Sequence, residues 1–150
     1  MNTKVLIVAL ISLTIAACNK DQFTTKPQLT FKQVNQTEYH LGDIIEFQID
    51  YTDKEGDIQN KLYLEEVTND KDCPDNNFKS FYQVPTDLPD QSQGKGTIVI
   101  RYTYAQLGQY PIYPGPKCQR NDTCHFRFAL TDKANNTSDT IESPQVVFIK

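Results

Sequence analysis

Apolar and polar residues alternate along most of the chain after residue 28. In the clearest run, Ile45, Phe47, Ile49 and Tyr51 alternate with charged or polar neighbours. This period of two predicts half-buried β-strands, each with one face in a core and one face toward water. The same reasoning predicts strands at residues 29–31, 44–51, 62–65, 78–84, 97–104, 124–130 and 146–149. No stretch has the periodicity of an amphipathic helix.

About seven strands separated by turn-forming residues predict an all-β domain, and this number is typical of a two-sheet Greek-key sandwich. We place a single domain of this kind at residues 28–150 and expect antiparallel strands. Turn chemistry is clearest at residues 53–57 and 94–96, which are rich in Asp and Gly.

The N-terminal segment follows a different pattern. Lys4 precedes an apolar run from Val5 to Ile11, and small residues lead to Cys18. This order is typical of a secretory signal peptide, and the run is shorter than the roughly 20 apolar residues of a membrane span. The sequence Ile15-Ala16-Ala17-Cys18 resembles the lipobox of bacterial lipoproteins. The resemblance implies removal of residues 1–17, lipidation of Cys18 and attachment to a membrane through the lipid. Residues 18–27 then read as a polar tether.

Composition and charge narrow the possible functions. The formal net charge is −4 and no basic run occurs, which argues against nucleic acid as a partner. The chain has only two histidines. We expect His40 and His125 to lie at the surface, so we predict no catalytic residue, no cofactor and no enzymatic activity.

Four cysteines are present, and lipidation of Cys18 leaves three. In an oxidising envelope, one pair should form a disulfide and one thiol should remain. Because Cys118 and Cys124 are close in sequence, we predict that they pair. Pairing of Cys73 with either of them is the alternative.

Two loops are rich in hard oxygen ligands. One contains Asp53, Glu55 and Asp57, and the other contains Asp132, Asn135, Asn136 and Asp139. In the predicted sandwich both loops lie at the same end, which would suit Ca²⁺. The alternative is that these side chains cap turns through hydrogen bonds to the backbone. We expect turn capping and assign no metal ligand.

The segment between residues 102 and 116 combines tyrosines with prolines. Tyr110 and Tyr113 on a proline-stiffened loop are candidates for contact with a sugar or a protein, because tyrosine offers contact area at low entropic cost. Alternatively, the tyrosines fill the core and the loop packs on the sandwich.

Residues 51–58 (YTDKEGDI) and 129–138 (ALTDKANNTS) each place an acidic turn directly after a strand. In this they resemble the Ig-like and cadherin-like domains of Bacteroidota lipoproteins. The resemblance implies an Ig-like topology and a lipid anchor in the outer membrane, on its periplasmic or external face. It also implies a non-enzymatic binding or adhesion module with a protein or glycan partner. A structural accessory subunit of an outer-membrane complex is the alternative, and an envelope hydrolase is a more remote one.

Overall fold

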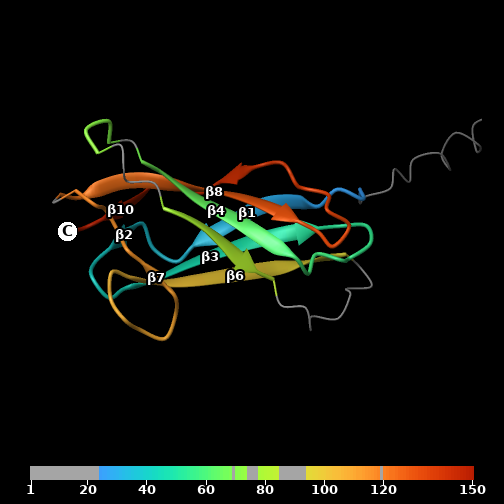
Figure 1. The fold of residues 1–150 in the computed structure, drawn as a ribbon, viewed down its shortest axis with the longest axis horizontal. Helices are drawn as coiled ribbons and strands as arrows, with labels where there is room; N and C mark the ends of the chain where they lie inside the picture. Colours follow the sequence, from blue (N-terminus) through green and yellow to red (C-terminus); the bar gives the residue numbers. More distant parts are fainter. Residues whose placement is uncertain (1–23, 69, 74–77, 85–93, 119) are drawn as a thin grey trace, which may run out of the picture.

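The computed structural model describes residues 24–68, 70–73, 78–84, 94–118 and 120–150 (Figure 1). Among these residues there are ten strands and no helix, so none of them forms a helix that is long and apolar enough to cross a membrane. The strands are β1 (Gln28–Val34), β2 (Glu38–Tyr39), β3 (Ile44–Thr52), β4 (Lys61–Thr68), β5 (Lys79–Gln83), β6 (Lys95–Tyr104), β7 (Ile112–Tyr113), β8 (Asp122–Thr131), β9 (Ile141–Glu142) and β10 (Val146–Phe148).

The strands form two sheets packed face to face. One sheet has the order β1-β3-β6-β7, and the other has the order β2-β10-β8-β4-β5, with β9 paired to β8. The chain crosses between the sheets after β3, after β5 and after β7, and it also enters the second sheet briefly at β2. Such crossings are typical of a Greek-key sandwich. The predicted all-β sandwich is therefore confirmed.

The seven predicted strands correspond to β1, β3, β4, β5, β6, β8 and β10. The additional strands β2, β7 and β9 have two residues each, too few to show a period of two. Two of them pair in parallel, β2 with β10 and β7 with β6. The seven predicted strands pair with one another only in antiparallel fashion, as predicted. These short strands extend the sheets at their edges.

Aromatic residues from both sheets fill the space between them. The Phe47 ring lies 4.9 Å from that of Phe126 and 5.2 Å from that of Phe128. The Tyr113 ring lies 4.6 Å from the Phe148 ring. All five side chains are at most 1% exposed, so the alternation seen in the sequence does mark the core.

The disulfide joins Cys73 to Cys118, with the two Cα atoms 6.2 Å apart, so the predicted Cys118–Cys124 pairing was wrong. Cys124 is a buried free thiol on β8, where the extended strand points its side chain into the core. Cys73 reaches Cys118 because β4 and β8 are paired, which brings the loop after β4 beside the loop before β8. Arg120 reinforces this junction through two hydrogen bonds of 2.6 Å to the Asp70 carboxylate.

The sandwich has two distinct ends. The described chain begins at Thr24, whose carbonyl accepts a hydrogen bond from the Lys54 amide at the end of β3. The opposite end of β3 begins at Ile44, and a nine-residue strand at about 3.3 Å per residue spans roughly 30 Å. Figure 1 shows the same separation: the first described residues lie at one end, and β7 and the C-terminus at the other. We call these the tether end and the distal end.

Candidate functional site

Three carboxylates meet at the tether end. Asp53 and Asp57 come from the loop after β3, and Asp132 comes from the loop after β8. One oxygen of each carboxylate lies within 4.8 Å of the others, and we call this group the acidic cluster. The prediction that the two loops lie at the same end is therefore confirmed. Glu55 is exposed and lies outside the cluster.

The two loops have the turn geometry that their sequences favour. Gly56 and Asn135 have positive φ values of 70° and 67°, which glycine and asparagine tolerate best. Gly94 approaches so closely that a Cβ atom there would lie 1.6 Å from the Asp53 carbonyl oxygen. The backbone of residue 94 can therefore pack against Asp53 only because it carries no side chain.

Some of the acidic oxygens cap these turns, as expected. The Asn136 amide donates to Asp132 Oδ1 over 2.8 Å, and Asn136 Nδ2 donates to Asp132 Oδ2 over 2.9 Å. The Asp57 amide donates to Asp53 Oδ2 over 3.2 Å. Two carboxylate oxygens take no part in this capping. Asp53 Oδ1 and Asp57 Oδ1 are buried and have no hydrogen-bond partner among the described residues. Burial raises the pKa of the Asp53 carboxyl group to about 6.

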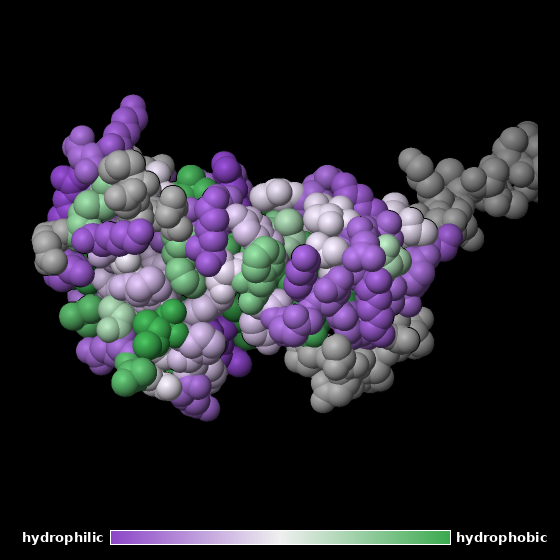
Figure 2. All heavy atoms as spheres, viewed as in Figure 1, coloured by the Kyte–Doolittle hydropathy of each residue, from purple (hydrophilic) through white to green (hydrophobic). Residues whose placement is uncertain are grey.

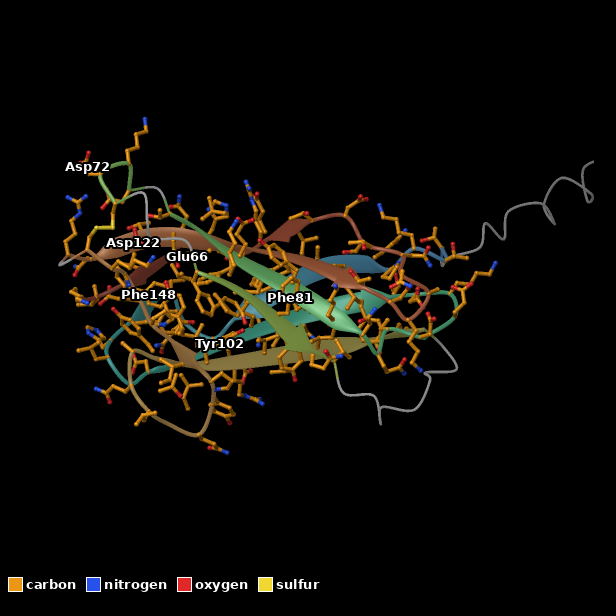
Figure 3. All side chains as sticks on the ribbon, viewed as in Figure 1. Glu66, Asp72, Phe81, Tyr102, Asp122 and Phe148 are labelled. Carbon is orange, nitrogen blue, oxygen red and sulfur yellow. A yellow bond between two sulfur atoms is a disulfide. The ribbon has the colours of Figure 1, made fainter. Side chains whose placement is uncertain are left out.

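A second polar group lies in the core near the distal end. Glu66 on β4 and Asp122 and Cys124 on β8 are each at most 3% exposed, and we call them the polar core cluster. Glu66 and Asp122 lie close together on the two neighbouring strands (Figure 3). Thr68 donates a hydrogen bond of 2.7 Å to Asp122, and the Phe78 amide donates one of 3.2 Å to Glu66 Oε2.

Burial is the main cause of the pKa shifts of two members of the polar core cluster, Glu66 and Cys124. It raises the pKa of Glu66 to about 7 and raises the pKa of the Cys124 thiol well above its usual range. The nearby Asp122 carboxylate adds to both shifts. A buried thiol held in its protonated form is a poor nucleophile, because the thiolate is the reactive species. The cluster therefore has the character of a structural polar network.

We did not predict this cluster from the sequence, although the sequence contains a sign of it. Glu66 continues the inward positions of Leu62 and Leu64 on β4, and Asp122 continues those of Cys124 and Phe126 on β8. A strand whose inward positions end on a carboxylate indicates a buried acid.

The distal end carries exposed apolar side chains. Leu107 is 92% exposed and Leu41 is 54% exposed, and Ile44 and Ile112 are also exposed. We call these four residues the distal patch. Figure 2 shows apolar residues gathered at this end of the molecule, around the loops that flank β3 and β7.

Backbone contacts hold the parts of the distal patch together. Ile44 and Ile112 both pair with Thr103 of β6, one from each side. The Gly42 amide donates a hydrogen bond of 2.9 Å to the Tyr104 carbonyl, which fixes the turn containing Leu41 beside the end of β6. The patch is therefore carried by the ends of paired strands and by a turn bonded to them.

The two tyrosines predicted as ligand contacts differ in position. Tyr113 is 1% exposed and belongs to the core, so its prediction as a surface contact was wrong. Its place on β7 turns the ring inward against Phe148. Tyr110 is partly exposed, and the Arg101 guanidinium lies 5.7 Å from the centre of its ring. Only Tyr110 is available at the surface, beside the distal patch.

In the described part of the chain, each histidine lies near a glutamate. His40 Nε2 lies 3.4 Å from Glu38, and His125 Nε2 lies 3.7 Å from Glu142. His125 is largely covered, so the expectation of a surface position fits His40 and not His125. The predicted lipidation site Cys18, the signal peptide 1–17 and the tether up to residue 23 lie outside the described residues.

Comparisons with known proteins give little further information. No protein-family model and no curated protein sequence matches the chain. Among solved structures, the sporulation control protein Spo0M from Bacillus subtilis is similar over 85% of this chain, with 8% identity and a TM-score of 0.40. The chain spans about half, 51%, of that protein's length.

Proposed function

We propose that this protein is a lipid-anchored lipoprotein of the bacterial outer membrane whose sandwich domain binds a protein partner through the distal patch. The observation that carries the proposal is the position of exposed apolar side chains at the end opposite the tether. An anchor at Cys18 would leave the distal end facing away from the membrane. In that orientation the distal patch is the part of the domain that is most accessible to a protein partner away from the membrane.

The composition of the patch favours a protein over a glycan. Three of the four exposed side chains come from loops and short strands, and all four are aliphatic. Sugars are usually bound by aromatic faces and polar groups, whereas aliphatic side chains gain most by burial against other apolar side chains. Tyr110 and Arg101 at the border supply the aromatic and cationic character common at protein interfaces.

The chemistry of the described residues favours binding over catalysis. Cys124 is buried and its thiol pKa is raised, which keeps the thiol protonated. The ion-pair contacts of the two histidines in the described chain are with Glu38 and Glu142. The grooves beside β1, of about 350 and 370 Å³, are lined without histidine or cysteine. Catalysis of acyl transfer requires a nucleophile paired with a base. Cys124 and the two histidines do not form such a pair in the described chain.

A role as an accessory subunit of an outer-membrane complex is the second candidate, supported by Phe81. This residue is 63% exposed and lies on β5, the edge strand of its sheet. Its ring packs against that of Tyr63, with 5.4 Å between the ring centres. An exposed aromatic on an edge strand is suited to pairing with another chain.

Site-specific photo-crosslinking in intact cells tests the proposal. A photoreactive amino acid is placed at Leu107, at Phe81 or, as a control at the tether end, at Asp139. We expect a discrete protein adduct from position 107, lost when Ile112→Glu is added. An adduct from position 81 alone would favour the accessory subunit. Equal labelling at all three positions, or none at position 107, would refute the role of the distal patch.

The anchor is tested separately with Cys18→Ala. We expect this variant to leave the membrane fraction or to retain its leader peptide. Loss of the adduct at position 107 in this variant, with the domain still folded, would show that partner binding depends on anchoring.

A further inference from the structure

We propose that the acidic cluster of Asp53, Asp57 and Asp132 binds a calcium ion, and that the bound ion fixes the tether against the sandwich domain. The first argument is the spacing of the oxygens. Ca²⁺ binds oxygen at 2.3 to about 2.6 Å, so oxygens in one coordination shell lie up to about 5 Å apart. The three carboxylate oxygens lie within 4.8 Å of one another.

The second argument is a buried oxygen without a partner. Asp53 is 0% exposed, and its Oδ1 accepts no hydrogen bond from the described residues. Asp57 Oδ1 is likewise buried and accepts no hydrogen bond from the described residues. Both residues belong to the acidic cluster, and buried carboxylates that lie this close need either a proton or a cation between them, because an unpaired buried carboxylate is costly.

The chemistry of the ligands selects the ion. The cluster offers carboxylate oxygens and no nitrogen or sulfur, which suits a hard cation such as Ca²⁺ better than zinc or copper. The oxygens of Asp132 that accept from Asn136 keep a second lone pair each, so capping the turn does not exclude coordination.

The third argument links the cluster to the tether. The Lys54 amide, directly after Asp53, donates a hydrogen bond of 3.0 Å to the Thr24 carbonyl. Asn136 Nδ2, which also binds Asp132, donates one of 3.3 Å to the Thr25 carbonyl. Both loops of the cluster therefore hold the chain just before β1. An ion that orders these loops also orders the hydrogen bonds that position the domain on its anchor.

Binding is tested on the full lipidated chain in detergent, by titration calorimetry with CaCl₂ for the stoichiometry and by scanning calorimetry for the melting midpoint. We expect one Ca²⁺ per chain and a melting midpoint about 5–10 °C higher at a hundredfold excess over Kd than in chelator. Asp53→Asn should lower the affinity at least tenfold and remove the midpoint shift. It should also melt in chelator at or above the parent midpoint, since it removes a buried charge. That result distinguishes loss of the ion from loss of the fold.

Two controls complete the test. Asp72→Asn changes a largely exposed acid in the loop after β4, at the distal end (Figure 3), and should bind Ca²⁺ like the parent. Glu66→Gln should do the same, because the polar core cluster is a separate group. Equal midpoints with Ca²⁺ and chelator, or binding that is lost in Glu66→Gln and kept in Asp53→Asn, would overturn the site.

Hydrogen exchange tests the second half of the proposal. Ca²⁺ should slow exchange of the Lys54 amide at least tenfold. It should leave unchanged the exchange of the Val147 amide, which lies on β10 in the sheet without β3 and donates to the Thr37 carbonyl. Calcium binding without added protection at Lys54 would refute the link to the tether.

Discussion

The buried carboxyl group of Glu66 should make the domain less stable as the pH rises. Burial raises its folded-state pKa from the ordinary 4.5 to about 7. A folded-state pKa above the unfolded-state value means that the folded chain holds the proton more tightly. The stabilisation is therefore fully present below pH 4.5 and is lost as the pH rises through about 7.

The size of the effect follows from the two pKa values. At about 1.4 kcal/mol per pKa unit, the change from 4.5 to about 7 corresponds to a loss of about 3 kcal/mol between the acid and alkaline limits. Such a loss is a large fraction of the roughly 5–15 kcal/mol that stabilises a typical domain. Glu66 is 2% exposed, so solvent screening reduces this value little.

Glu66→Gln is the perturbation that isolates this group. The amide has the shape of the protonated acid, can still accept from the Phe78 amide and does not titrate. At pH 8 we expect the variant to be more stable than the parent by up to about 3 kcal/mol. At pH 4 the free energies of unfolding of the parent and the variant should be nearly equal. The remaining carboxyl groups titrate in both proteins, so the difference in stability between them reports Glu66 together with its interaction with Asp122.

Urea unfolding followed by tyrosine fluorescence measures the effect, because the chain has eight tyrosines and no tryptophan. Glu65→Gln is the matched control. Glu65 faces outward and binds Lys79 over 2.8 Å, which lowers its pKa, so this variant should be slightly less stable than the parent at pH 8. Parallel curves for parent and Glu66→Gln from pH 4 to 9, or a Glu66→Gln protein that is less stable at pH 8, would refute the reasoning.

Three further predictions concern the disulfide, the core and the anchor. Cys73→Ser should lower the free energy of unfolding by about 4 kcal/mol in the chain-entropy model for a 45-residue separation, whereas Cys124→Ser should leave the disulfide intact in non-reducing peptide maps. Phe47→Ala should cost about 3–5 kcal/mol in urea unfolding, and exposed Phe81→Ala should cost much less. A fatty-acid analogue should label the parent and not Cys18→Ala, and labelling of both would contradict lipidation at this residue.

The sequence by itself determined the strands and the faces they bury. Alternation at Ile45, Phe47 and Ile49 leaves one register in which the apolar side chains all lie inside, because a shift by one residue would expose every one of them. Asp and Gly after these strands determined where the chain turns, and strand order placed Asp53 and Asp132 at one end. These features depend on local pattern, so they can be read without coordinates.

Only the tertiary structure decided which distant groups meet. Cys73 pairs with Cys118 because β4 lies beside β8, a relation between residues 45 positions apart that sequence proximity does not reveal. Tyr113 enters the core because two residues of β7 add a strand beside β6, a run too short to show a period. The charge state of Glu66 and the free oxygen of Asp53 depend on what surrounds them. Burial and neighbouring carboxylates are properties of the packed sandwich, and they arise only once both sheets are in place.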